Sequence, residues 1–242
     1  MKIQSVLSVL LLGLAPLSGV SHASDFCQNA VKNINTAYQS YRSFADDSYD
    51  DDTFSNLVIK TLKDKQSLNC DWSELKLNVA YSPDKHLMSM DWQVDGGGTM
   101  KEFQSVLQYQ KGNQPTVVNG SNGYVLEIHQ MDIGGKPLYL VKDWSAGYTA
   151  LNGQTINLYQ IKNHTPTPAK LIKTKQGLTH TIGFAYNPFS IPDELDKLIE
   201  VNAKQKEFSI PVVIENEQYP EGEVTKRVLR YRYNGKQFVY VK

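Results

Sequence analysis

Long hydrophobic runs are scarce in this chain. The one clear apolar stretch covers Val6 to Val20, and no later segment is long enough to suggest a membrane span. An excess of either charge is also missing, because 25 lysine and arginine residues balance 25 aspartate and glutamate residues. A chain without a basic excess is a poor candidate for binding nucleic acid or anionic lipid, so neither partner is expected.

Cysteine is nearly absent, since the sequence holds only Cys27 and Cys70. Two cysteines alone make a poor zinc site, and no histidine nearby completes one. Two cysteines in an exported chain usually pair, so we predict a disulfide between Cys27 and Cys70. The histidines share no metal-ligand spacing with one another. The sequence therefore predicts neither a metal site nor a cofactor.

The first residues have the pattern of a secretory signal peptide. Met1-Lys2 is a short positive start, the apolar stretch follows, and Ser21-His22-Ala23 is a small-x-small cleavage pattern. A lipoprotein is the closer competitor, because Cys27 follows soon after. Asp25-Phe26 stands directly before that cysteine, where lipid modification requires small residues. We therefore expect a signal peptide over residues 1–23, cleavage after Ala23, and a periplasmic protein without a membrane anchor.

Residues 24–72 are predicted to form a helical hairpin. Apolar residues recur there at spacings of three and four. The first face consists of Phe26, Ala30, Val31, Ile34, Tyr38 and Tyr41, and the second of Phe54, Leu57, Val58, Thr61 and Leu62. An acidic run, Asp46 to Asp52, separates the two helices. It lacks the spacing of a calcium-binding loop, so we interpret it as a solvated connection. An antiparallel hairpin would return Cys70 to Cys27.

Residues 73–242 change to a period of two, which is typical of β-strands. Strand-like segments lie near 124–131, 137–142, 155–162, 179–186, 208–214, 224–233 and 237–241, separated by glycine-containing turns. Only Pro192 to about Lys206 has a helical pattern again. The prediction is an α+β protein: a disulfide-stapled helical hairpin, then a mainly antiparallel β domain with one further short helix.

One segment resembles a known group of proteins. It comprises the turn Ser82-Pro83-Asp84-Lys85, the strand up to Trp92, the sequence Gly96-Gly97-Gly98-Thr99-Met100 and the returning strand to Tyr109. Over about residues 80–110 it is similar to a segment of uncharacterised exported proteins of Gram-negative bacteria. The resemblance implies a bacterial periplasmic origin and no assigned activity.

The first candidate site lies at the end of the strand that contains Trp92. Met88, Met90, Trp92 and Val94 are predicted to face the core, while Ser89, Asp91, Gln93 and Asp95 face solvent. Asp91 and Asp95, beside Gly96, Gly97 and Gly98, have the form of an acid/base pair or a calcium or ligand loop. The alternative is a solvent-facing strand that ends in a glycine turn. Lys101 lies at the same turn.

A basic stripe near the C-terminus is the second candidate. Arg230 and Arg232, with Lys226, face the same side of a predicted strand, which is typical of a site for an anion or an acidic partner. The alternative is an edge strand protected by charge against aggregation. Trp92 and Trp144 are a further pair of candidates, for a carbohydrate or small ligand.

No group of residues forms an enzyme signature. The Gly-x-Ser-x-Gly elbow is absent, and Asp143-Trp144-Ser145-Ala146-Gly147 matches it only in part. The best single acid/base candidate is His129 beside Glu127. We therefore interpret the chain as a non-enzymatic periplasmic binding protein with a protein partner, such as an inhibitor or an immunity protein against an envelope-targeted toxin. The alternative is a small envelope-polymer hydrolase using Asp91, Asp95 or His129.

The cleavage site gives a direct prediction. Mass spectrometry of the protein recovered from periplasmic extract should show a chain that begins at Ser24 and carries no lipid, because the small-x-small pattern ends at Ala23. A chain beginning with an acylated Cys27 would contradict it.

Overall fold

The computed structural model describes residues 19–43, 51–94, 101–148, 150–191 and 198–242. Two α-helices, α1 (Gly19–Ser43) and α2 (Asp51–Lys63), come first and are followed by the 3₁₀ turn η1 (Lys65–Asn69). Fifteen strands in three sheets and a second 3₁₀ turn, η2 (Pro188–Ser190), make up the rest of the described chain. The protein is therefore α+β, as the sequence predicts.

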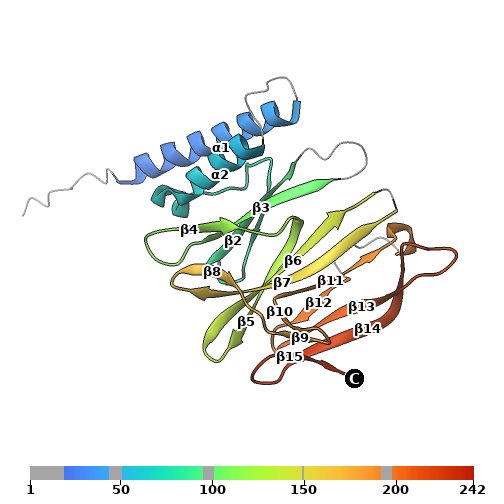
Figure 1. Cartoon of the computed structure of the whole chain (residues 1–242). Helices are drawn as coiled ribbons and strands as arrows, with labels where there is room; N and C mark the ends of the chain where they lie inside the picture. Colours follow the sequence, from blue (N-terminus) through green and yellow to red (C-terminus); the bar gives the residue numbers. More distant parts are fainter. Residues whose placement is uncertain (1–18, 44–50, 95–100, 149, 192–197) are drawn as a thin grey trace, which may run out of the picture.

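The first sheet lies directly under the helices (Figure 1). Its strands are in the order β1 (Asn78–Tyr81), β2 (Leu87–Val94), β3 (Glu102–Tyr109) and β4 (Thr116–Asn119). They form an antiparallel meander, since each strand pairs with the next one along the chain. The predicted faces of both helices are confirmed: Ile34, Phe54, Val58 and Leu62 are completely buried against this sheet.

The second sheet has the order β11-β7-β6-β5, and β8 also pairs with β7. Its strands are β5 (Tyr124–Ile133), β6 (Lys136–Ala146), β7 (Asn152–Lys162), β8 (Thr165–Pro168) and β11 (Thr181–Tyr186). The third sheet has the order β10-β9-β15-β14-β13-β12. Its strands are β9 (Ile172–Thr174), β10 (Gly177–Thr179), β12 (Glu200–Asn202), β13 (Glu207–Ile214), β14 (Glu223–Tyr233) and β15 (Phe238–Val241).

The helices and the three sheets form successive layers, and an apolar core lies between each layer and the next. One lies between the helices and the first sheet, one between the first and second sheets around Leu107, Tyr139 and Val141, and one between the second and third sheets around Leu140, Leu158 and Phe208. The second sheet is therefore covered on both faces. Alternating residues of β6 point into different cores, which is why Leu138 to Asp143 are all buried.

The long strands agree closely with the sequence pattern, and one predicted element does not. The short helix predicted over about residues 192–206 is wrong for the part that the structure describes. Residues 200–202 form β12, and residues 203–206 form the turn into β13. Residues 192–197 lie outside the described residues. The apolar spacing of this segment instead reflects a short strand: Val201 of β12 and Ile199 just before it both pack in the core between the second and third sheets.

The predicted disulfide is confirmed. Cys27 in α1 and Cys70 after η1 are joined, with Cα atoms 5.2 Å apart. Asn35 reinforces this contact by hydrogen-bonding the segment that follows, since its Oδ1 accepts from the Lys76 amide at 2.8 Å and its Nδ2 donates to the Glu74 carbonyl at 3.0 Å. The start of the helical layer is thus fixed to the start of the first sheet.

Replacing both cysteines, Cys27→Ser with Cys70→Ser, should lower the free energy of unfolding by at most about 4 kcal/mol, because the bond restricts a long loop of the unfolded chain. Urea unfolding of the oxidised protein and of the double variant measures this difference. Reduction of the unmodified protein should produce the same loss. Equal midpoints for oxidised, reduced and substituted protein would contradict the prediction.

Candidate functional site

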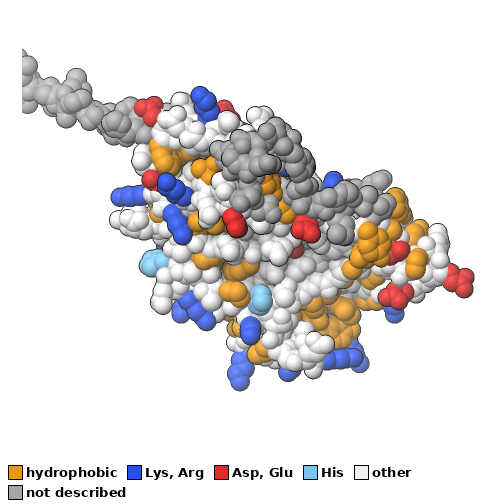
Figure 2. Space-filling view, turned by 45° about the horizontal axis from the view of Figure 1, so that its top comes forward, with side chains coloured by type: hydrophobic (Ala, Val, Ile, Leu, Met, Phe, Trp, Pro, Cys, Tyr) orange, Lys and Arg blue, Asp and Glu red, His pale blue; other side chains and the backbone are white. Residues whose placement is uncertain are grey.

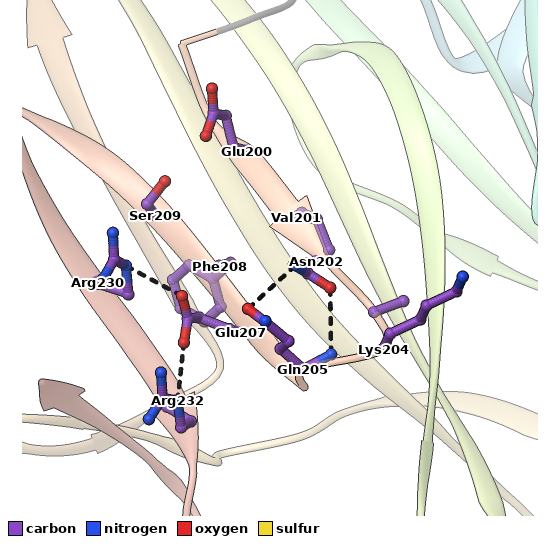
Figure 3. A pocket seen from close by; sticks show the side chains of 11 residues that line it. Glu200, Val201, Asn202, Lys204, Gln205, Glu207, Phe208, Ser209, Arg230 and Arg232 are labelled. Carbon is purple, nitrogen blue, oxygen red and sulfur yellow. Dashed lines mark hydrogen bonds and ion pairs between the residues drawn. The ribbon is translucent and has the colours of Figure 1, made fainter.

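A groove of about 880 Å³ lies on the outer face of the third sheet (Figure 3). It crosses β12, β13 and β14, and the turn between β12 and β13 forms one wall. The strand alternation explains its polar lining. Phe208 and Ile210 face the core, so Glu207 and Ser209 face outward, opposite Arg232 and Arg230 in the register of β14.

Glu207 holds the two arginines at the groove. Its Oε1 forms an ion pair with Arg230, with Nε at 3.0 Å, and its Oε2 accepts a hydrogen bond from Arg232 Nε at 2.8 Å. The Glu207 side chain is 10% exposed, whereas the two arginine side chains are 48% and 53% exposed. Each guanidinium therefore pairs with the buried carboxylate through Nε, and no other residue of the described chain forms a hydrogen bond or ion pair with it. The two outer nitrogens of each guanidinium are donors suited to a second carboxylate.

Two further features define the groove. Asn202 and Gln205 form a side-chain hydrogen bond of 3.1 Å on the wall opposite the arginines. The charged lining consists of Arg230, Arg232, Lys204, Glu200 and Glu207. Cations exceed carboxylates there, and the more deeply buried carboxylate is already paired. The groove thus favours an anionic group over a cationic one.

The basic stripe lies on two parts of β14 that differ in their pairing. At Arg230 and Arg232 the strand pairs with both β13 and β15, so edge protection does not explain these two residues. At Lys226 the strand has no β15 partner among the described residues, so this end of β14 is an edge. Arg230 and Arg232 share the groove, but Lys226 is not part of its lining. The register shifts between Pro211 and Val213, opposite this part of β14. A strict alternation of inward and outward residues cannot predict such a shift in register.

Asp91 was predicted to face solvent, and that prediction is wrong. The residue is fully buried, because the outer face of β2 is covered by the second sheet. Its Oδ1 accepts a 2.9 Å hydrogen bond from Asn78 Nδ2, which also donates to the Val125 carbonyl at 2.7 Å. No residue of the described chain makes a hydrogen bond to its Oδ2. Asp95, Gly96, Gly97 and Gly98 lie outside the described residues.

A second carboxylate, Asp143 of β6, enters the same layer. It is 4% exposed, and its Oδ2 accepts from Asn157 Nδ2 at 2.7 Å. Burial raises the pKa of Asp91 to about 7, and the charge of Asp143 adds to this increase. Burial likewise raises the pKa of Asp143 to about 6, against the hydrogen bonds that it accepts. Both carboxyl groups between the two sheets therefore keep their protons to a higher pH than a solvent-exposed aspartate does.

The tryptophan candidates are not brought together. Trp92 is 2% exposed and packs edge-on against Phe54, with ring centres 5.4 Å apart, on the helix side of the first sheet. Trp144 is partly buried in the second sheet, 5.8 Å from the Phe103 ring. Lys101 is exposed, and its backbone forms a bridge to Ala146. No single face combines these residues with Arg230 and Arg232.

The acid/base candidate His129 lies on the second sheet, on the face toward the third. Its Nε2 is 3.1 Å from Glu127 Oε2, and Lys142 Nζ is 3.1 Å from the same oxygen. Burial lowers the pKa of His129, and the Glu127 charge opposes that effect. Glu127 thus lies between the Lys142 ammonium and the His129 ring. The arrangement is best described as an ion pair that compensates the charge of the buried Lys142. It does not have the form of an open catalytic acid/base pair.

Comparison with protein-family models, curated proteins and solved structures finds no match to this chain. Among the described residues, no cluster of three or more histidine, cysteine, aspartate or glutamate side chains is arranged to hold a metal ion. Within the same ranges, no helix combines the length and hydropathy that a membrane span requires. Figure 2 shows acidic and basic side chains on the same face of the molecule, in keeping with the balanced composition.

The buried acids predict that stability falls as pH rises. An aspartate in the unfolded chain titrates near pH 4, whereas Asp91 retains its proton up to about pH 7 in the folded protein. Its stabilising contribution is therefore complete below about pH 4 and is lost as the pH rises to about 7. The size is about 1.4 kcal/mol for each unit by which the two pKa values differ.

Asp91→Asn should remove this loss, because the amide stays neutral and still accepts the Asn78 hydrogen bond. The free energy of unfolding, measured in urea from pH 5 to pH 8, should increasingly favour the variant as pH rises. Burial of neutral His129 acts in the opposite direction, but equally in both proteins. Glu102→Gln, at an exposed carboxylate of β3, is the control. Parallel curves for wild type and Asp91→Asn would exclude a buried, protonated Asp91.

Proposed function

We propose that this protein is an exported, non-catalytic binding protein whose groove on the third sheet takes an acidic segment of a protein partner in the cell envelope. The observation that carries the proposal is the position of Arg230 and Arg232. Glu207 pairs with the Nε of both guanidinium groups, both arginines line the groove, and no other described residue forms a hydrogen bond or ion pair with either one. Arginines pre-oriented in this way lose little side-chain entropy when a carboxylate binds.

The chemistry of the groove favours an acidic peptide over a neutral sugar. Its one aromatic residue, Phe208, is 1% exposed and offers no ring face for stacking. The remaining lining is polar and charged, and it extends over three strands. A few arginine anchors within a standard interface account for much of the affinity in many complexes. An inhibitor, or an immunity protein against an envelope-targeted toxin, would use such a surface.

The alternative, an envelope-polymer hydrolase, has weaker support. Asp91 is enclosed between two sheets, and Glu127 beside His129 is engaged by Lys142. Asp91 therefore lacks the open approach that a polymer substrate needs, and Glu127, although half exposed, is held by the Lys142 ion pair. Export supports the envelope as the compartment, since the disulfide and the signal-like start fit an oxidising environment.

The groove predicts a specific loss of binding. Arg230→Gln with Arg232→Gln should weaken binding of a fluorescent decaglutamate peptide by at least about tenfold, because each charge-assisted hydrogen bond contributes strongly. Lys226→Gln with Arg227→Gln removes the same charge from the same exposed strand, outside the groove, and is the matched control. Fluorescence anisotropy at 150 mM salt measures both affinities.

A pull-down from envelope extract tests the partner itself. The protein with the control substitutions should recover the same partner as the unmodified protein, and the Arg230→Gln with Arg232→Gln variant should lose it while its circular dichroism spectrum is unchanged. If both double variants lost the partner equally, the binding would depend on net charge and not on the groove. Full binding by the groove variant would place the interface elsewhere.

A further inference from the structure

The chain itself contains an acidic segment of the kind that the arginine groove would bind. It consists of the turn between β13 and β14 and the first residue of β14, and no lysine or arginine occurs within residues 208–225. Figure 1 shows this turn protruding at one end of the molecule. The acidic residues of the segment are Glu215, Glu217, Glu221 and Glu223.

Two of these carboxylates are not engaged by the chain. Glu215 and Glu217 are exposed, and neither forms a hydrogen bond or ion pair with a described residue. Glu223 instead accepts a 2.6 Å hydrogen bond from Asn216 Nδ2, and Asn216 Oδ1 accepts from the Tyr219 amide at 2.8 Å. The turn therefore presents two unpaired carboxylates on a backbone that hydrogen bonds hold in shape.

The two free carboxylates match the groove in charge, number and spacing along the chain. Glu215 and Glu217 are two positions apart, as are Arg230 and Arg232 of the groove (Figure 3). On the extended strand β14, two positions correspond to about 7 Å. Each guanidinium can then take one carboxylate through its outer nitrogens, which is the geometry that arginine–carboxylate pairs favour.

The acidic turn and the groove lie at opposite ends of the same pair of strands. Glu207 is opposite Arg232 at the groove end, and Ile214 is opposite Glu223 at the turn end. Seven positions of a strand separate the two ends, or about 23 Å. Two copies whose β13–β14 hairpins pack antiparallel about a two-fold axis would place each acidic turn at the groove of the other. Such a contact is made twice and closes at two copies.

The residues between the two ends have opposing effects on this contact. Ile214 and Val228 are large apolar side chains that are 40% and 47% exposed, and packing of the two hairpins would remove them from water. Lys226 and Arg227 lie on the same stretch, and their like charges oppose the approach of a second copy. We therefore expect a weak association that depends on salt.

We propose that the groove is occupied by a second copy of this chain, whose Glu215 and Glu217 bind Arg230 and Arg232 in a two-fold symmetric dimer. The inference rests on the proposed function, because it names an occupant of the same groove. Any other acidic partner must then displace the second copy, so the dimer is a resting form that keeps the groove closed.

Sedimentation velocity tests the dimer directly. The dimer fraction should rise between about 1 and 200 µM protein, and it should fall when salt is raised from about 50 to 500 mM, because salt screens exposed charges. Saturating decaglutamate should return the protein to monomer, since the peptide and the second copy compete for one groove. A dimer that persists with the peptide bound would overturn the proposal.

Charge reversal identifies the two surfaces. The turn variant is Glu215→Arg with Glu217→Arg. The groove variant is Arg230→Glu with Arg232→Glu, together with Glu207→Gln, which removes the buried carboxylate that would otherwise lose its partners. Each variant alone should self-associate at least about tenfold more weakly, because both of its contacts join like charges. An equimolar mixture of the two should form a heterodimer, because both contacts then join opposite charges.

The matched control for the mixture is Glu74→Arg with Glu102→Arg, at two exposed carboxylates outside the third sheet. It changes net charge as the turn variant does but keeps the acidic turn, so it should not pair with the groove variant. Equal pairing of the control and the turn variant with the groove variant would attribute the association to net charge and overturn the proposal. Circular dichroism checks that each variant is folded.

The results separate this inference from the proposed function. A protein that stays monomeric at all concentrations but binds decaglutamate through Arg230 and Arg232 would overturn the dimer and leave the groove as a site for other acidic partners. A monomer that binds no decaglutamate would overturn both.

Discussion

The second sheet is buried on both of its faces, and the rest of the structure depends on this constraint. Strand β6 is the clearest case, since Leu138 to Asp143 are all buried and alternate between two cores. The first sheet packs on one face and the third sheet on the other. The helices can then cover only the far side of the first sheet. No described helix or sheet packs on the outer face of the third sheet, and the arginine groove lies there.

The same constraint explains the buried polar groups. A strand enclosed on both sides has no wet face, so each polar residue on it must find a partner inside. Asp143 finds Asn157, and Lys142 finds Glu127. Asp91 finds Asn78 for only one of its oxygens, and burial leaves it protonated near neutral pH. Asp91 and Asp143 make the contact between the first two sheets sensitive to pH, because ionising a carboxyl group is costly in an apolar layer.

The arginine groove is built by the pairing of neighbouring strands. The groove is a surface of one sheet, where the cross-strand register places Arg230 and Arg232 around Glu207. It has an excess of cations and suits carboxylates.

The sequence by itself determined the local elements. The helical spacing of Ile34, Phe54 and Val58 and the alternation along the long strands both reflect side-chain direction, which depends on the backbone period alone. The disulfide also followed from composition, because Cys27 had only one possible partner. Arg230 and Arg232 could be selected as a candidate site because they lie two residues apart on a strand.

Only the tertiary structure decided which strand faces are exposed to solvent and which residues are in contact. A period of two separates the two faces of β2 but does not say whether a second sheet covers the polar one, so Asp91 was assigned to solvent and is buried. Glu207 was missed because its partnership with two arginines depends on the register between β13 and β14, which bring together residues more than 20 positions apart. The residues of β12 have the spacing of a helix but pair as a strand, because the adjacent edge of β13 offers hydrogen bonds that a helix there would leave unmade.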